Sequence, residues 1–175
     1  FSFLPVPIVW ILAIVGAFFF GAAWAFIPAY LQAKRGSHIV ITTIMFNFIA
    51  SSLMVYLLVD VIRDMKQMGP HTVALPKELW LPSFKDLAAL FGIKIRYSPL
   101  NLSFLLAIAA SFFVWFLVWK TKWGYEMRAV GHNMQAAIYA GISPYKNIIL
   151  AMLISGGLAG LLSINEILGV HHKIV

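Results

Sequence analysis

Residues 8–31 read IVWILAIVGAFFFGAAWAFIPAYL and include no charged side chain. A helix needs about 20 apolar residues to cross the roughly 30 Å of hydrocarbon in a bilayer, so this run is long enough to span a membrane. Three more runs approach or reach that length, at residues 39–59, 102–119 and 148–168. In lipid only helices and closed barrels satisfy their backbone polar groups, and these runs lack the alternation of barrel strands. The sequence therefore predicts an all-α, polytopic transmembrane protein with four spans.

The composition supports this fold class and excludes others. Of the 175 residues, 62% are hydrophobic and 11% are charged, whereas a soluble domain carries about 25% charged residues. The net charge is +7, but the 13 lysines and arginines stand singly or in pairs between the apolar runs. Such spacing is typical of membrane loops and not of a basic face that binds nucleic acid. The chain has no cysteine, which rules out disulfides, thiolate metal sites and cysteine nucleophiles.

The segments between the spans differ in length and charge. Residues 63–101 are interrupted by several prolines, and we expect an extracytoplasmic loop there, either irregular throughout or with an amphipathic turn near Ser83. The lysines and arginines divide almost evenly between the two sides of the membrane. The rule that basic loops are cytoplasmic gives most weight to short loops, so it favours that side for residues 34–38 and for the loop at residues 120–146. The chain begins at Phe1 within an apolar run and ends without a polar tail. We therefore expect an internal fragment of a longer membrane protein.

Small residues recur at every fourth position in the first and fourth spans. Glycine, alanine and serine let two helix backbones approach closely, which is how helices associate in lipid. The stripes predict tight helix packing, either as a static contact or as a sliding interface. They consist of Ala13, Ala17, Gly21, Ala25, Ala29 and Ala33 in the first span, and of Ala151, Ser155, Ala159 and Ser163 in the fourth, where Gly156 and Gly160 form a GxxxG pair on an adjacent face.

Five polar residues within the spans are candidates for a substrate pathway. Thr43, Asn47 and Ser51 follow one another at helical spacing and form one polar stripe on the second span. An amide in lipid must face protein or water, so Asn47 either joins two helices or lines a pathway. Asn165 and Glu166 lie near the end of the fourth span, where the carboxylate either has a function or reaches water. An uncharged stripe in mid-membrane suits a neutral, hydroxylated solute.

The most informative loop covers residues 123–146, WGYEMRAVGHNMQAAIYAGISPYK. Asn133 can cap a short helix, and Gly141 can supply the left-handed residue that ends it. Ser143 can then cap the fourth span, with Pro144 at its first position. These start and stop signals predict a rigid short helix between two spans.

A helix bounded in this way is suited to dock on another protein. Its small residues Ala136, Ala137 and Ala140 would permit a close approach to a groove in that partner. The alternative is a plain amphipathic connector between the two spans.

This loop resembles the cytoplasmic loop of bacterial ABC importer permeases for simple sugars, nucleosides and related solutes. Those permeases carry a stretch similar to GYELRAVGxNxxAAxYAGI, which residues 124–142 match at most positions. The stretches KRGSHIVITTIMFNFIA at residues 34–50 and LISGGLAGLLSINEILG at residues 153–169 are also similar to segments of that family. The likeness covers most of the chain. It departs at His38 and Ile39, where nucleoside-type members often have Asn and Glu.

The resemblance implies the membrane-spanning permease subunit of an ATP-driven, binding-protein-dependent importer of a small polar solute, a simple sugar or a nucleoside, in the bacterial inner membrane. It implies that a separate cytoplasmic ABC ATPase uses the ATP, and no GxxxxGK[ST] motif occurs in this chain. The subunit is then no enzyme and binds no cofactor itself. An extracytoplasmic solute-binding protein and a second permease subunit, identical or related, are the other implied partners. The residues implied to couple to the ATPase are Gly131, Asn133, Ala136, Ala137, Tyr139, Ala140 and Gly141.

Two other interpretations use the same residues. One is a structural or assembly subunit of a membrane complex with no translocation pathway. The other is an intramembrane enzyme that uses Glu166 with His171 or His172. Adjacent histidines point apart on a helix and lack a third ligand here, so no metal site is expected.

Overall fold

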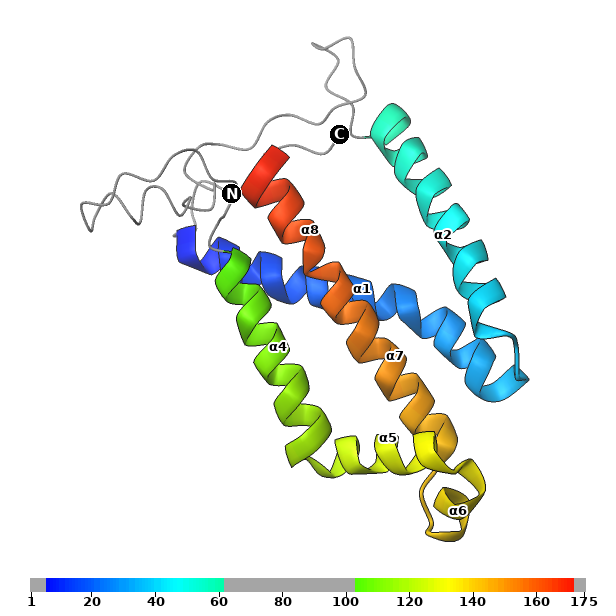
Figure 1. The fold of residues 1–175 in the computed structure, drawn as a ribbon. Coiled ribbons are helices and arrows are strands. Elements are labelled where there is room, and N and C mark those ends of the chain that lie inside the picture. Colours follow the sequence, from blue (N-terminus) through cyan, green and yellow to red (C-terminus); the bar gives the residue numbers. More distant parts are fainter. Residues whose placement is uncertain (1–5, 62–102, 172–175) are drawn as a thin grey trace, which may run out of the picture.

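The computed structural model describes residues 6–61 and 103–171, and nearly all of them are helical. The expected loop at residues 63–101, with its turn near Ser83, lies outside the described residues, as does His172. The helices follow one another with short connections (Figure 1). They are α1 (Val6–Arg35), α2 (Ile39–Tyr56), the π-helical η1 (Leu57–Val61), α4 (Ser103–Lys120), α5 (Lys122–His132), α6 (Met134–Tyr139), α7 (Pro144–Gly160), α8 (Leu162–Ile164) and the π-helical η3 (Asn165–His171).

Four helical stretches of this described part are long and apolar enough to cross a membrane. They are Val6–Arg35, Ile39–Val61, Ser103–Lys120 and Pro144–Leu168. The predicted all-α, polytopic fold is therefore confirmed. The first stretch runs about a turn further than the apolar run at residues 8–31, because helix geometry continues to the positive-φ residue Gly36.

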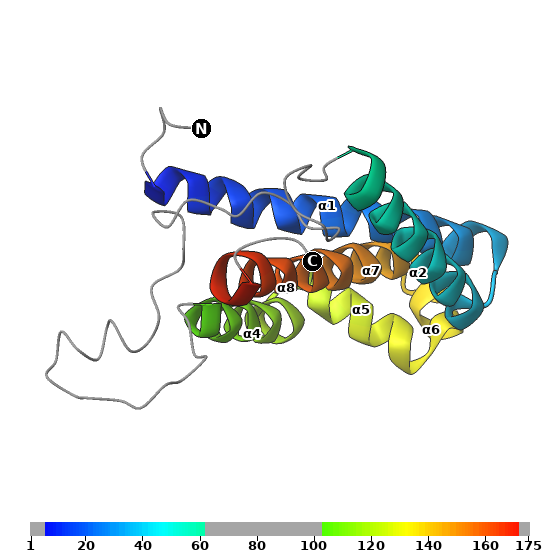
Figure 2. The same cartoon turned by 90° about the horizontal axis from the view of Figure 1, so that it is seen from above.

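Helices α1 and α7 cross at glycines and are the most closely associated pair of long helices. A Cβ added to Gly21 of α1 would collide with the carbonyl oxygen of Gly156, and one added to Gly160 would collide with that of Ala17. The backbones can approach so closely only because these side chains are absent or minimal. Figure 1 shows α1 crossing α7, and Figure 2 shows the two helices lying next to each other. The predicted GxxxG contact is thus confirmed.

The second small-residue stripe of the fourth span does not make this contact. Ala151, Ser155, Ala159 and Ser163 are all exposed. The adjacent face, with Gly156 and Gly160, takes their place against α1. Within the described part of the chain α7 therefore meets α1 through its glycines, which allow a closer approach than alanine or serine, and the packing of this second stripe stays a prediction.

Helix α2 packs on the C-terminal half of α1 and stands apart from η3 in both views (Figures 1 and 2). The two helices are joined by a tight turn in which Gly36 adopts φ 64° and its N–H donates to the carbonyl of Gln32 at 3.1 Å. Trp24 and Phe46 then meet edge to face, with ring centroids 5.9 Å apart. This contact holds the two helices together next to the turn.

The chain turns sharply where α4 meets α5, and the turn directs α5 across the end of α7 (Figure 1). The Thr121 hydroxyl donates to the carbonyl of Leu117 at 2.6 Å and accepts from the N–H of Gly124 at 3.2 Å. Gly124 is buried, and a Cβ there would collide with the carbonyl oxygens of Leu117 and Val118. Thr121 and Gly124 together fix this corner.

Many large apolar side chains of the spans are exposed, such as Phe20 at 82% and Phe48 at 71%. In water such an apolar surface would favour aggregation, whereas in a membrane lipid or further helices can cover it. The spans therefore have the surface of membrane helices, and the fold depends on close contacts at a few small residues.

Candidate functional site

The short helix α6 is bounded at both ends by specific hydrogen bonds. At its start, Asn133 Oδ1 accepts from the N–H of Ala136 at 3.1 Å. At its end, Gly141 adopts φ 77° and donates to the carbonyl of Ile138, while Ile142 donates to that of Ala137, both at 2.9 Å. This pair of bonds is the usual way in which a left-handed glycine ends a helix. The predicted roles of Asn133 and Gly141 as the caps at the two ends of α6 are confirmed.

The start of α7 differs in detail from the prediction. Pro144 is the first residue of α7, as expected, but the side chain of Ser143 makes no capping hydrogen bond. The carbonyl of Ser143 instead accepts from Nδ2 of Asn147 at 3.0 Å. The amide side chain of Asn147 thus reinforces the first turn of α7.

Asn147 also connects α7 to α5. Its side chain is 5% exposed, and Nδ2 lies 3.5 Å from Oε2 of Glu126. Glu126 in turn pairs with Lys122 one helical turn earlier, at 3.9 Å. A buried amide needs such partners, since an unpaired polar group would be costly. Sequence reasoning missed this contact, although an asparagine directly before the apolar run at residues 148–168 was a usable signal.

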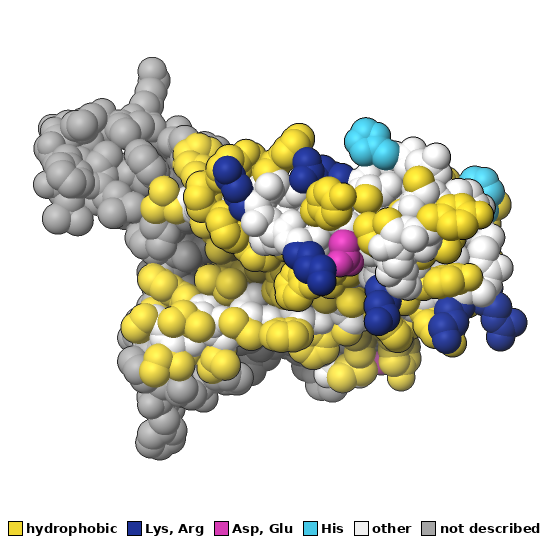
Figure 3. Space-filling view, turned by 90° about the horizontal axis from the view of Figure 1, so that it is seen from below, with side chains coloured by type: hydrophobic (Ala, Val, Ile, Leu, Met, Phe, Trp, Pro, Cys, Tyr) yellow, Lys and Arg dark blue, Asp and Glu magenta, His cyan; other side chains and the backbone are white. Residues whose placement is uncertain are grey.

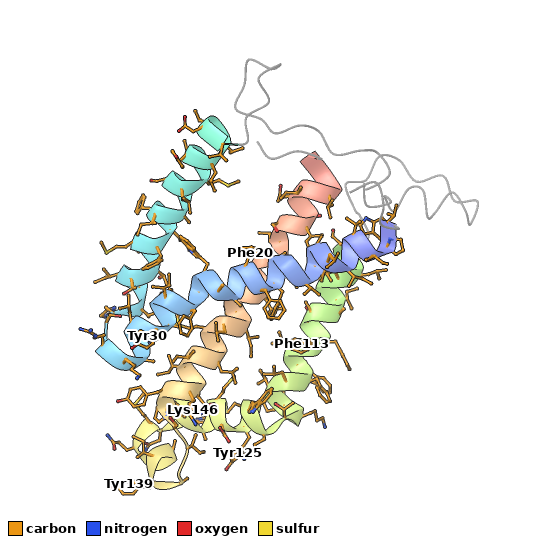
Figure 4. All side chains as sticks on the ribbon, turned by 180° about the vertical axis from the view of Figure 1, so that it is seen from behind. Phe20, Tyr30, Phe113, Tyr125, Tyr139 and Lys146 are labelled. Atoms are coloured by element: carbon orange, nitrogen blue, oxygen red, sulfur yellow. The ribbon has the colours of Figure 1, made fainter. Side chains whose placement is uncertain are left out.

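The exposed side of α6 is mostly apolar, with Gln135 as its polar member, and α6 lies at the outer end of the bundle (Figure 1). Tyr139 is 91% exposed and extends from the outer end of the loop (Figure 4), and Met134 and Ile138 are about half exposed. Ala136 and Ala140 are also exposed. Ala137 is only 3% exposed, so its side chain packs inside the chain and does not belong to the outer surface that the sequence suggested.

The α5–α6 end of the molecule is basic. Figure 3 views this end and shows lysine and arginine side chains around an acidic patch. Among the described residues, Glu126 is the acid of this end, whereas Asp60 and Glu166 lie in η1 and η3 at the opposite end. The basic residues come from four helices that meet or end here: Lys34 and Arg35 of α1, Lys120 of α4, Lys122 and Arg128 of α5, and Lys146 of α7.

The candidate pathway residues fall into two groups that the structure does not bring together. On α2, Asn47 and Ser51 are exposed, and the half-buried Thr43 donates to the carbonyl of Ile39 at 2.9 Å. In η3, Asn165 accepts a hydrogen bond from the hydroxyl of Ser103 at 2.7 Å, and Glu166 is exposed.

A groove of about 1040 Å³ lies between α4 and the helices α7, α8 and η3. The Ser103–Asn165 hydrogen bond lies at one end, and the indoles of Trp115 and Trp119 line the other. Nothing in the sequence reasoning predicted it, because its two walls come from helices that are distant in the chain.

Comparison with known proteins identifies the family. Residues 2–174 match the family described as the permease component of the branched-chain amino acid transport system. The chain belongs to this permease family. The family membership predicted from the loop at residues 123–146 is therefore confirmed.

Relatives of the chain include permeases named for guanosine, for nucleosides and for glucose. The chain is 38% identical over 160 residues to the guanosine ABC transporter permease protein NupP of Bacillus subtilis, covering 90% of this chain and 43% of that protein. It is 35% identical over 167 residues to the nucleoside ABC transporter permease protein NupB of Lactococcus lactis, covering 90% and 42%. It is 31% identical over 149 residues to the glucose ABC transporter permease protein TsgB13 of Haloferax volcanii, covering 85% and 39%.

The chain thus spans less than half the length of these relatives. The relatives are permease components, which are transport subunits rather than enzymes. No solved structure matches the chain.

Proposed function

We propose that the chain forms part of the membrane-spanning permease subunit of an ATP-driven importer for a nucleoside or a simple sugar. The observation that carries this proposal is α6, a short helix fixed at both ends, with an exposed apolar side, on the basic end of a bundle of membrane helices. Basic residues favour the cytoplasmic side. A rigid apolar helix on that side is suited to bind a cytoplasmic partner.

The proposed partner of α6 is an ABC ATPase that hydrolyses ATP, so that this subunit needs no cofactor of its own. Met134, Ile138 and Tyr139 would fill a cleft of the ATPase, and Ala136 and Ala140 would allow its backbone to come close. Gly131 and Asn133 precede the helix, and Gly141 ends it. The inner membrane of a bacterium, an extracytoplasmic solute-binding protein and a second permease subunit complete the proposed assembly.

A movement of α6 has a direct route into the membrane. The turn after α6 ties it to α7, and the Asn147–Glu126 contact ties α7 to α5. Helix α7 meets α1 at Gly156 and Gly160, where backbones touch without flexible side chains between them. Closure of the ATPase would therefore displace α5, α6 and α7 together and change the packing on α1.

The proposed solute pathway includes the polar stripe of α2. Asn47 and Ser51 are exposed on a helix that crosses lipid, and a polar side chain in that position must face water or protein. A neutral, hydroxylated solute fits these side chains. The names of the nucleoside and glucose relatives support the same class. Asn165 and Glu166 would belong to the outer end of the pathway.

The assignment of α6 is tested in the full-length permease expressed with its ATPase. Tyr139→Arg should abolish co-purification of the ATPase and solute uptake, because it places a charge on the exposed apolar side. Tyr56→Arg is the matched control. Tyr56 is also more than half exposed, but it is the last residue of α2 and lies at the end of the molecule opposite to α6. Normal ATPase binding by Tyr139→Arg would reject the coupling role. If the wild type binds the ATPase but takes up no solute, the alternative of an assembly subunit without a translocation pathway would be favoured.

A further inference from the structure

We propose that the groove between α4 and α7–η3 binds one anionic phospholipid. Its acyl chain would lie along the apolar wall of the groove, and its phosphate would lie at Lys120 and Arg128. This site is separate from the polar stripe of α2 and from the proposed ATPase contact on α6, and at Asn165 its outer end borders the end of the proposed pathway.

The wall of the groove fits an acyl chain. Of its 14 lining side chains, 11 are aliphatic or aromatic, and the alanines at positions 107 and 110 leave room for a ligand. Ser111 is the one polar residue between its two ends. From Ser103 to Trp119 the groove follows about 24 Å of helix at 1.5 Å per residue. One leaflet contributes about half of the roughly 30 Å hydrocarbon core. The groove is therefore long enough to hold the chain of a lipid from the leaflet at the α5–α6 end.

Trp115 and Trp119 line the groove at the end next to α5, and a basic side chain lies over the ring of each. The guanidinium carbon of Arg128 lies 4.5 Å from the ring centroid of Trp119. The ammonium group of Lys120 lies 5.9 Å from the ring centroid of Trp115. Tryptophan is enriched at the height of lipid headgroups. One end of the apolar groove thus lies next to two basic side chains, at the height where a lipid phosphate is expected in the bilayer.

These two cations have no counter-charge in the described part of the chain. Glu126, the acid of this end, is occupied by Lys122 and Asn147. The Nε of Arg128 is buried without a hydrogen-bond partner among the described residues. A phosphate close to these groups would supply the missing negative charge, and arginine binds phosphate strongly through charge-assisted hydrogen bonds.

An amphiphile fits this combination better than other occupants do. A soluble anion would satisfy the cations and leave the apolar wall uncovered. A further apolar helix would cover the wall and leave Arg128 partly desolvated without an opposite charge, which is unfavourable. An anionic phospholipid supplies both parts, and anionic lipids attract basic residues next to a membrane.

The experiment uses the full-length permease with its ATPase, reconstituted in nanodiscs of phosphatidylglycerol and phosphatidylcholine and released for native mass spectrometry. The wild type should retain one phosphatidylglycerol and little phosphatidylcholine. The double variant Lys120→Gln/Arg128→Gln should reduce that retention by on the order of tenfold. Lys34→Gln/Lys146→Gln is the matched control, because it removes two charges from the same end but none from the indoles of the groove.

A second variant keeps both cations and fills the groove. Ala110→Trp should also release the lipid, since Ala110 lines the wall. Equal retention of phosphatidylglycerol by the wild type and either groove variant would overturn the proposal. Displacement by millimolar inorganic phosphate would identify a site for free anions and overturn it as well. A photoreactive residue at position 107 should label lipid, and labelling of protein alone would show that a helix fills the groove.

Discussion

Nδ2 of Asn147 donates to Oε2 of Glu126 at 3.5 Å and to the carbonyl of Ser143 at 3.0 Å. One buried amide thereby connects the first turn of α7 with the middle of α5. Because α6 lies between these two helices in the chain, the contact closes a small unit of three helices. Its integrity should decide whether movement of α6 reaches the membrane.

Asn147→Leu should weaken this unit. The change leaves the Glu126 carboxylate without its amide donor, and the loss of such a bond typically costs about 1–3 kcal/mol of stability. We expect a lower melting temperature of the full-length permease and less solute transported per ATP hydrolysed. Glu126→Gln is the control, because the glutamine oxygen still accepts from Asn147. A normal ratio of transport to hydrolysis in Asn147→Leu would show that the contact does not transmit movement.

Gly21→Ala should destabilise the crossing of α1 and α7. The new methyl group would meet the Gly156 carbonyl, and overpacking of this kind typically costs about 1–3 kcal/mol. Gly16→Ala is a matched control five residues earlier on the same helix, because a Cβ at Gly16 meets nothing within 4 Å. Thermal unfolding of both variants in detergent checks the prediction. Equal melting temperatures would mean that α1 and α7 do not cross at these glycines.

Gly141→Val should disturb the end of α6 because Gly141 has φ 77°. A left-handed conformation costs a residue with a side chain about 1–2 kcal/mol, and a β-branched residue tolerates it worst. The variant should bind the ATPase less tightly, as measured by co-purification. Gly141→Asn should restore most of the binding, since asparagine adopts this conformation more readily. If the valine and asparagine variants bind alike, the left-handed turn is not what positions α6.

The elements of this fold were predictable where a single residue type sets a local conformation. The length of the apolar runs predicted the spans, and Asn133 and Gly141 predicted the ends of α6. The GxxxG pair predicted a close helix contact, which α7 makes with α1. What the sequence could not supply was the face that each helix turns to its neighbours. Membrane helices are apolar all round, so no amphipathic pattern records orientation.

Three features of the candidate site escaped prediction for this reason. Ala137 turned out to be buried by its own chain rather than available to a partner. The groove depends on the approach of α4 to α7–η3, which no local pattern encodes. The contact of Asn147 with Glu126 joins residues 21 positions apart on different helices. Tertiary packing decides all three.

Asn47→Leu should reduce solute uptake without affecting assembly. Asn47 is exposed on α2, so its removal leaves no partner within the described chain unsatisfied, and a purely structural loss is not expected. If the amide binds the solute, the loss of one hydrogen bond of about 1–2 kcal/mol lowers kcat/KM for uptake by about fivefold to thirtyfold.

Thr42→Val is the matched control for this prediction. Thr42 lies on the same helix, and its hydroxyl donates to the carbonyl of His38 at 3.1 Å, so the change also removes a polar group from α2. Uptake of radiolabelled guanosine and of glucose by cells with the full-length transporter measures both variants. A fall confined to Asn47→Leu and to one solute would assign both the pathway and the solute class. Equal uptake by Asn47→Leu and wild type would make Asn47 a helix-packing residue, because an exposed amide in lipid must otherwise face another helix.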